Sequence, residues 1–230
     1  MLGNLHVYVN DGEIMAIIEG ENLKFVKELF QKELKGEVNL IFFKSEDNCE
    51  TCNDIKQLLS ELAAIDSRIK LTVYDIKENA KEAKFLGVDK APATVIGGKK
   101  IYNAYYFGMP SGYEFSALLE DIVDASSGVT KLSESTKEAL KGLKNNIEIK
   151  VFVTPTCPYC PRAVRMAHQL AMESSKVKGI MVESMEFPEW ANQYDVMAVP
   201  KVVINDTNSF EGALPEKEFV EEVMKVDAAS

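Results

Sequence analysis

The stretch VFVTPTCPYCPRAV, residues 151–164, sets two cysteines three positions apart, between an apolar run and a segment with helical spacing. Val151, Phe152 and Val153 are typical of a buried strand. After Cys160, apolar residues recur at intervals that place them on one face of a helix. The stretch therefore predicts a strand, a short loop and a helix that the C-x-x-C motif opens. Three kinds of chemistry suit such a motif: a metal clamp, a structural disulfide or a redox centre.

The motif occurs twice in the 230-residue chain. Cys49 and Cys52 form the first pair and Cys157 and Cys160 the second, at an offset of 108 residues (157 − 49), and these are the four cysteines of the sequence. A repeat of this length is too long for a solenoid and suits a duplicated domain.

An X-Pro dipeptide stands before a strand-like segment in each unit and supports the repeat. Ala91-Pro92 precedes ATVI and Val199-Pro200 precedes KVVI, again 108 residues apart. A proline that faces its C-x-x-C pair would remove one backbone N–H there. The backbone of Ala91 or Val199 would then be free to pair with an extended substrate chain, so we count all four residues as candidate substrate-binding residues.

Each unit has the same order of elements: a helix, then βαβ, a short helix and ββα. This order predicts an α/β fold in which each unit has a mixed sheet of four or more strands, with helices on both faces. Small polar residues in 124–133 predict the boundary, which divides the chain into units 1–124 and 125–230. A capping box is expected from Ser135 to Glu138, and residues 5–20 could add a strand pair.

The first cysteine of each pair is the expected nucleophile. A helix N-terminus leaves backbone N–H groups unpaired and carries partial positive charge, which stabilises a thiolate. Cys49 and Cys157 are therefore expected at a helix start with exposed sulfurs. Cys52 and Cys160, one turn further on, are expected to be more buried and to resolve a mixed disulfide.

These motifs resemble those of a known family. CPYC followed by Pro161, together with APAT and AVPK, is similar to the thioredoxin superfamily. The duplicated form, with FVTPTCPYCP, RMAH, EWANQYDVMAVPK and FEGALPE, resembles the glutaredoxin-like protein disulfide oxidoreductases of hyperthermophiles over nearly the whole chain. The resemblance implies two tandem thioredoxin-like folds, cis peptide bonds before Pro92 and Pro200, and dithiol–disulfide exchange on protein substrates. It also implies re-reduction by an NADPH-dependent flavoprotein of the thioredoxin-reductase type, with no cofactor bound by the chain itself.

Two features depart from the common pattern of that superfamily. Thioredoxins proper place an acidic residue on the strand six positions before the first cysteine, whereas this chain has Phe43 and Val151 there. The proton relay attributed to that acid must be absent or supplied by another residue. The first pair also encloses Glu50 and Thr51, where common versions have an aromatic residue or a proline.

Zinc binding by four thiolates is the main alternative for the two pairs. Zinc ribbons place their pairs ~15–20 residues apart, whereas 104 residues separate Cys52 from Cys157. A purely structural disulfide would close too short a loop to constrain the unfolded chain much. We therefore expect no metal site and interpret both pairs as redox centres.

Other polar and aromatic residues receive structural interpretations. His168 lies eleven residues after Cys157, which is too far along a helix for a catalytic base, so it is expected to be a satisfied core or surface residue. Asp75 and Glu183 recur at strand ends and are interpreted as helix caps or loop charges. Trp190 is expected to pack on a helix near the second pair.

Composition excludes several classes of partner. The net charge is −10 and the pI about 4.9, with only three arginines, which argues against binding nucleic-acid phosphates. The N-terminus lacks the pattern of a secretory signal, and no apolar stretch approaches the ~20 residues that span a bilayer. The expected location is the cytoplasm, without membrane attachment.

These features predict a thiol–disulfide oxidoreductase with two centres that acts on the disulfides or dithiols of proteins. The alternative is a binding or redox-sensing scaffold of thioredoxin fold in which one centre is vestigial. The second centre is expected to be the more reactive, because Glu50 adds negative charge beside Cys49. The positive charges of Arg162 and Arg165 are expected to favour the thiolate of Cys157.

Overall fold

The computed structural model describes residues 16–47 and 49–229, so the strand pair expected in residues 5–20 lies almost wholly outside the described residues. The first unit contains these elements: α1 (Gly20–Glu33), β1 (Val38–Lys44), α2 (Cys52–Ile65), β2 (Ile69–Asp75), α3 (Ala80–Phe85), β3 (Ala93–Gly97), β4 (Ile101–Phe107) and α4 (Glu114–Ser127). The second unit repeats them: α5 (Glu134–Lys141), β5 (Ile147–Val153), α6 (Cys160–Glu173), β6 (Val177–Glu183), α7 (Pro188–Gln193), β7 (Lys201–Ile204), β8 (Asn208–Glu211) and α8 (Glu216–Ala229). No helix within the described ranges combines the length and the apolar character needed to cross a bilayer.

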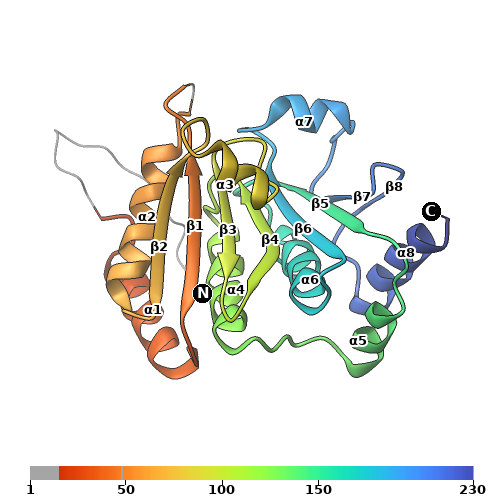
Figure 1. The fold of residues 1–230 in the computed structure, drawn as a ribbon, viewed down its shortest axis with the longest axis horizontal. Coiled ribbons are helices and arrows are strands. Elements are labelled where there is room, and N and C mark those ends of the chain that lie inside the picture. Colours follow the sequence, from red (N-terminus) through yellow and green to blue (C-terminus); the bar gives the residue numbers. More distant parts are fainter. Residues whose placement is uncertain (1–15, 48, 230) are drawn as a thin grey trace.

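All eight strands form one sheet, in the order β2-β1-β3-β4-β6-β5-β7-β8 (Figure 1). In the first unit β1 pairs with β2 in parallel and with β3 antiparallel, and β3 and β4 form a hairpin. The second unit repeats this pairing with β5, β6, β7 and β8. The βαβ and ββα order expected from the sequence is confirmed, and the parallel pairing of β4 with β6 joins the two units.

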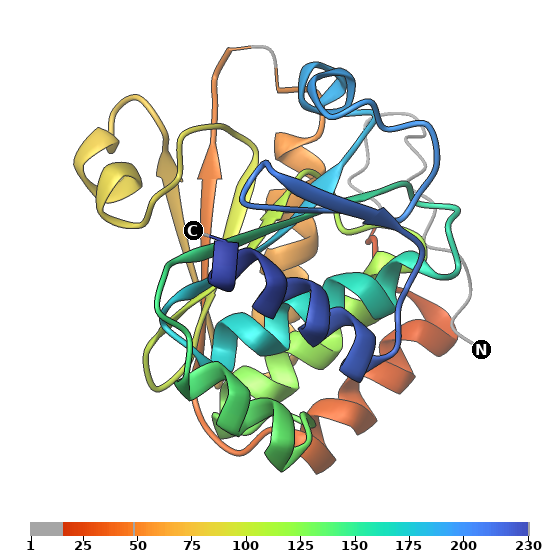
Figure 2. The same ribbon diagram turned by 90° about the vertical axis from the view of Figure 1, so that its right-hand side faces the viewer.

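Helices cover both faces of the sheet, but unequally. Buried apolar side chains of α1, α2, α4, α5, α6 and α8 form one large cluster with one face of the sheet. The opposite face is covered by α3 and α7, whose side chains pack on a smaller cluster. Figure 2 shows α3 and the long helices on opposite sides of the sheet. The helix that follows each C-x-x-C pair therefore lies on the more heavily covered face.

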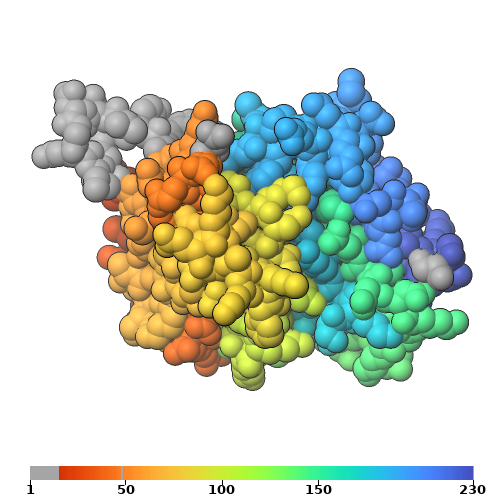
Figure 3. Space-filling model, turned by 45° about the horizontal axis from the view of Figure 1, so that its top comes forward, coloured from red at the N-terminus to blue at the C-terminus, as the bar shows by residue number. Residues whose placement is uncertain are grey.

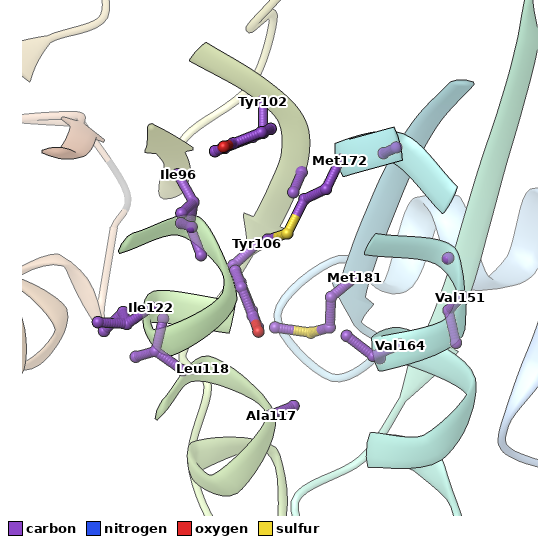
Figure 4. Close-up of a cluster of buried hydrophobic side chains, with 14 of the residues drawn as sticks. Ile96, Tyr102, Tyr106, Ala117, Leu118, Ile122, Val151, Val164, Met172 and Met181 are labelled. Atoms are coloured by element: carbon purple, nitrogen blue, oxygen red, sulfur yellow. The ribbon is translucent and has the colours of Figure 1, made fainter. Parts of the chain in front are cut away.

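The two units share a packed core where α4 meets α6. Tyr106 on β4 is fully buried and lies between Leu118 of α4 and Met181 of β6 (Figure 4). Val164 of α6 belongs to the same cluster and is also fully buried. Burial of each apolar side chain of this size stabilises the fold by about 1.5–3 kcal/mol. These contacts therefore fix the position of α4 against α6.

The helix start predicted for the second unit is wrong. α5 begins at Glu134, and Ser133 is its N-cap, accepting a hydrogen bond from the Thr136 backbone N–H at 3.3 Å. Ser135 lies inside the helix, so no capping box runs from it to Glu138. The carboxylate of Glu216, on α8, instead accepts from the Ser133 backbone N–H at 2.9 Å. A side chain from another helix thus supplies the half of the box that the sequence pattern assigned to α5.

The segment expected to separate the units holds the end of α4 and its connection to α5. Gly128 follows α4 with a φ of 70°, a left-handed conformation that ends a helix at low cost for glycine. The sheet is continuous across this connection. The division into units 1–124 and 125–230 therefore stays a prediction from the sequence repeat.

Candidate functional site

Both C-x-x-C pairs lie at the same edge of the sheet. Cys49 and Cys52 follow β1, Cys157 and Cys160 follow β5, and the strand pairings make β1 and β5 run in the same direction. Each pair is a disulfide, with Cα–Cα distances of 5.4 Å and 5.5 Å. Four strand positions separate the pairs, about 19 Å at ordinary strand spacing. Pairs this far apart cannot surround one tetrahedral zinc ion.

The second centre is held by backbone groups from two directions. α6 begins at Cys160, so Cys157 lies in the loop before the helix, and not at its first residue as expected. The backbone N–H of Cys160 nevertheless points at the Cys157 sulfur, with an N–S distance of 3.1 Å. The Val199 carbonyl oxygen lies 3.7 Å from the same sulfur. Cys157 is only 7% exposed and Cys160 is fully buried, so the expectation of an exposed first sulfur is wrong for this disulfide form.

The first centre is more open. Cys49 is half-buried and Cys52 is 6% exposed, which is the expected ranking within the pair. The backbone N–H of Ser45 donates to the Cys52 sulfur at 3.4 Å. Thr51, between the two cysteines, donates its hydroxyl hydrogen to the carboxylate of Glu186 in the second unit.

A proline segment adjoins each centre. The peptide bonds Ala91-Pro92 and Val199-Pro200 are both cis, as the resemblance implies. The carbonyl of Pro92 accepts a hydrogen bond from the following hairpin at 3.2 Å, and that of Pro200 accepts the corresponding bond at 2.8 Å. The two segments therefore occupy equivalent places in the two units. The Val199–Cys157 contact brings one of the predicted substrate-binding residues to a predicted nucleophile.

An acid that the sequence did not single out lies in the core next to the second centre. The positions that carry the buried acid in thioredoxins are apolar here: Phe43 and Val151 are fully buried. Glu114, the first residue of α4, is 1% exposed, and neither of its carboxylate oxygens has a hydrogen-bond partner within the described part of the chain. Burial raises the pKa of Glu114 to about 8.

The register of α4 against α6 places Glu114 beside the first turn of α6. At one end of the helix pair, the Tyr113 backbone N–H donates to the Pro155 carbonyl at 3.2 Å, just before the second C-x-x-C. At the other end, the Thr130 hydroxyl donates to the Glu173 carboxylate at 2.8 Å. The two helices therefore run side by side in the same direction. Their first turns lie at the same level, and the resolving cysteine begins α6.

Local sequence offers little signal for Glu114. Its counterpart in the second unit, at the offset of 104 residues, is Glu218, which is exposed on α8. Both glutamates precede a buried phenylalanine, Phe115 or Phe219. The difference arises because α6 of the second unit covers the start of α4, which one-dimensional patterns cannot reveal.

Comparison with known proteins agrees with this geometry. The family model for the thioredoxin domain matches residues 147–225. The chain is 30% identical to a protein disulfide oxidoreductase from Aeropyrum pernix K1 whose crystal structure superposes with a TM-score of 0.87, covering 96% of each chain. The chain belongs to the protein disulfide oxidoreductases.

The oxidoreductase is also similar to AhpF, a component of alkyl hydroperoxide reductases. The structure of AhpF of Enterococcus faecalis superposes with a TM-score of 0.80 at 26% identity, covering 89% of this chain and 98% of that one. The corresponding protein of Staphylococcus epidermidis is 23% identical over 197 residues. That match covers 86% of this chain but 36% of the relative, and the chain spans about a third of the length of the curated relatives it matches.

A buried ion cluster joins the two units of the oxidoreductase. Arg165 on α6 pairs with Asp121 and Asp124 on α4, and Asp121 also accepts a hydrogen bond from the Tyr106 hydroxyl. His168 Nδ1 lies 2.6 Å from an Asp121 carboxylate oxygen. The expectation that Arg165 favours the Cys157 thiolate is therefore wrong, because two carboxylates already neutralise its charge. His168 is fully buried, which confirms its interpretation as a core residue.

The remaining residues singled out in the sequence have structural roles. Asp75 accepts from the Lys77 backbone N–H at 2.9 Å, and Glu183 accepts from the Glu186 backbone N–H at 2.7 Å. Both acids thus cap the loop that follows their strand, as expected. Trp190 lies on α7 and packs on Phe107 of the first unit, with ring centroids 5.2 Å apart.

Proposed function

We propose that the protein exchanges electrons with the disulfides of protein substrates at both C-x-x-C centres. The observation that carries this proposal is the repeated arrangement of the site. Each unit sets a cysteine disulfide at the carboxyl end of a buried strand, beside an X-Pro segment at the same edge of the sheet. The fold and both cysteine pairs are those of a thiol–disulfide oxidoreductase.

The proposed step at the reduced second centre begins with the Cys157 thiolate. It attacks one sulfur of a substrate disulfide, so a bond from Cys157 to the substrate forms and the substrate disulfide breaks. The departing substrate thiolate takes up a proton from the solvent, because Cys157 starts as a thiolate and the centre holds only the Cys160 proton. Cys160 then loses its proton, attacks the Cys157 sulfur and releases the second substrate thiol. The substrate gains two electrons and two protons, and the centre becomes the disulfide seen here.

Glu114 is the proposed proton acceptor for Cys160. It is buried beside the first turn of α6, its carboxylate has no hydrogen-bond partner in the described residues, and its pKa of about 8 is close to that of a free thiol. Proton transfer between the two groups is therefore nearly balanced, the condition in which a general acid or base works in both directions. Reduction of the centre would use the same group as a proton donor.

The proline segments are proposed to bind the substrate backbone. The Val199 carbonyl already lies 3.7 Å from the Cys157 sulfur, so a chain bound along Val199 and Pro200 would bring its disulfide to the nucleophile. Ala91 and Pro92 would serve the first centre in the same way. Backbone pairing of this kind accepts many sequences, which suits an enzyme that acts on varied proteins.

Re-reduction needs an external source of electrons. We propose a flavoprotein of the thioredoxin-reductase type that takes electrons from NADPH, with the chain itself binding no cofactor. The similarity to AhpF of alkyl hydroperoxide reductases supports a place in an electron-transfer chain. We place the exchange in the cytoplasm of a thermophile. Intracellular proteins rarely contain disulfides in most organisms, but those of hyperthermophiles often do.

The test is insulin-disulfide reduction driven by dithiothreitol. We expect turnover from the wild type and from each variant that keeps one centre, Cys49→Ser/Cys52→Ser or Cys157→Ser/Cys160→Ser. Loss of all four thiols should abolish it. If one centre alone accounts for the whole rate, the other is vestigial and the scaffold alternative holds for that unit. No turnover from any form overturns the proposal.

A further inference from the structure

A carboxylate of the second unit reaches the loop of the first centre. Glu186 lies in the connection between β6 and α7, and one of its oxygens accepts a hydrogen bond from the Thr51 hydroxyl inside the C-x-x-C loop. Its other oxygen accepts from the Met109 backbone N–H, just after β4, at 2.6 Å. One side chain therefore ties the first redox loop to the end of β4 and to the second unit. Figure 3 shows the segment around α7 adjoining the first unit on this side of the molecule.

The surroundings of Glu186 are shaped to receive it. Gly108 has a φ of 97°, and a Cβ there would lie 2.6 Å from the Glu183 Cβ and 3.0 Å from a Glu186 carboxylate oxygen. The Gly108 backbone N–H donates to the Pro92 carbonyl at 3.2 Å. Only glycine combines this conformation with such a close approach. The carboxylate is thereby connected to both parts of the first centre, the cysteine loop and the proline segment.

The equivalent glutamate of the first unit, Glu78, lies in a similar loop but is not buried against the other unit. Glu78, at the offset of 108 residues, donates its backbone N–H to Asp75, as Glu186 does to Glu183, so the two loops are built alike. Glu78 is nevertheless exposed. β2, which precedes it, is an edge strand, whereas β6 lies beside β4 of the other unit. At the second centre, the counterpart of Thr51 is Tyr159, which is 63% exposed.

Most charged groups on the elements that contact Glu186 are acidic. Glu183 comes from the end of β6, Glu50 from the redox loop and Asp54 from the first turn of α2. The nearby cations of the β1 and β2 ends, Lys44 and Lys77, are paired with the carboxylates of Glu46 and Asp47. The residues that follow β4, Gly108 and Met109, bring no charge. Of the other lysines on these elements, Lys178 lies at the opposite end of β6 and pairs with Glu148, and Lys56 lies one turn into α2. Neither of them forms an ion pair with Glu186 within the described residues.

We propose that Glu186 is a positioning residue of the first centre, fixing the Thr51 loop against the second unit and disfavouring the Cys49 thiolate by its charge. Like charge near a thiolate lowers the thiolate fraction. The first centre is thus made less reactive by a residue that only the assembled pair of units supplies. The inference rests on the proposed function, because it concerns how one of the two proposed centres is tuned.

The experiment is alkylation of reduced Cys49 by iodoacetamide against pH, in the full chain carrying Cys157→Ser and Cys160→Ser. Glu186→Gln removes the charge, and Glu78→Gln is the matched control on the equivalent loop. We expect Glu186→Gln to speed alkylation at pH 7 about two- to fivefold and to move the pH midpoint down. Glu78→Gln should stay within about 1.5-fold of its parent, because its exposed charge is screened. Thr51→Val, which keeps the charge but removes the hydroxyl, should move the midpoint less than Glu186→Gln.

The outcomes separate this inference from the proposed function. Equal alkylation of Glu186→Gln, Glu78→Gln and their parent overturns the inference, even where insulin turnover is intact. A shifted midpoint in a protein that reduces no insulin supports the inference and overturns the proposed function. The same Glu186→Gln change, made in a chain that keeps only the second centre, should leave Cys157 alkylation unchanged. A shift there of the same size would mean a general loosening of the fold and would overturn the positioning role.

Discussion

The two redox centres have almost the same local design but different neighbours. Each C-x-x-C follows a buried strand and begins a long helix, and each adjoins a cis-proline segment. At the second centre, the Cys160 N–H and the Val199 carbonyl enclose the Cys157 sulfur, and buried Glu114 lies beside the helix start. At the first centre, Cys49 is half-buried, and Glu186 holds the loop through Thr51.

The difference teaches that each centre is completed by the other unit. Glu114 belongs to the first unit and lies by the second centre, while Glu186 belongs to the second unit and lies by the first. Their counterparts in the repeat, Glu218 and Glu78, are both exposed. The same residue type at the same place in the fold therefore changes its environment only where the units meet. A duplicated domain can thus acquire two unequal centres without a large change in either motif.

The largest expected effect comes from the nucleophilic cysteines. Cys160→Ser should leave Cys157 able to hold a substrate as a mixed disulfide, whereas Cys157→Ser should trap nothing at that centre. Non-reducing electrophoresis with reduced protein and an oxidised substrate gives the readout. Trapping through Cys160 in the Cys157→Ser variant would reverse the assignment of attacker and resolver.

The next largest effect concerns the contact between the units. Arg165→Met leaves the buried carboxylates of Asp121 and Asp124 without their cation, which should lower the free energy of unfolding by about 3–5 kcal/mol. Arg162→Met, an exposed site one turn earlier on α6, should change it by less than about 0.5 kcal/mol. Urea unfolding of the oxidised proteins measures both. Similar stabilities for the two variants would mean that the ion cluster does not hold the units together.

Glu114 should also leave a signature in stability against pH. The folded protein keeps this proton up to about pH 8, whereas the unfolded chain releases it near the ordinary glutamate value, so folded protein binds more protons in between. The contribution of this group to stability therefore falls as pH rises from about 4.5 to 8. Relative to Glu114→Gln, the free energy of unfolding of the wild type should fall by at most about 5 kcal/mol across that range.

Urea unfolding of the wild type and Glu114→Gln at several pH values, with the disulfides intact, gives the comparison. Glu218→Gln is the control at the exposed counterpart, and its free energy of unfolding should depend on pH as that of the wild type does. If the free energies of unfolding of the wild type and Glu114→Gln differ by the same amount at all pH values, Glu114 has an ordinary pKa.

The smallest effect is expected from the exposed charge inside the first motif. Glu50→Gln should change the alkylation rate of Cys49 by less than about twofold at physiological salt, because solvent and ions screen an exposed charge. An increase that exceeds that of Glu186→Gln would locate the tuning charge within the C-x-x-C motif itself. Iodoacetamide kinetics at low and high salt would distinguish the two residues further, since the Glu50 effect should weaken more.

Sequence patterns predicted the helices and strands well because the local residue preferences of each unit agree with its fold. The strand-like runs before both motifs, the helical spacing after Cys52 and Cys160, and the X-Pro offsets all indicated the observed fold. The pairing of β4 with β6 had no such signal, since it depends on contacts between distant parts of the chain. The errors share this origin: Glu216 caps α5 from α8, and Arg165 is neutralised by α4.

The most direct test of the account is a crossed comparison of both centres in one assay. Reduced proteins that keep one centre each are mixed with a reporter disulfide, and single-turnover oxidation is followed from pH 6 to 9. Glu114→Gln should slow the second centre about a hundredfold and leave the first within twofold. Glu186→Gln should speed the first centre two- to fivefold and leave the second within twofold. If each substitution affects the centre of its own unit, or neither substitution affects any centre, the claim that each unit completes the other's centre is contradicted.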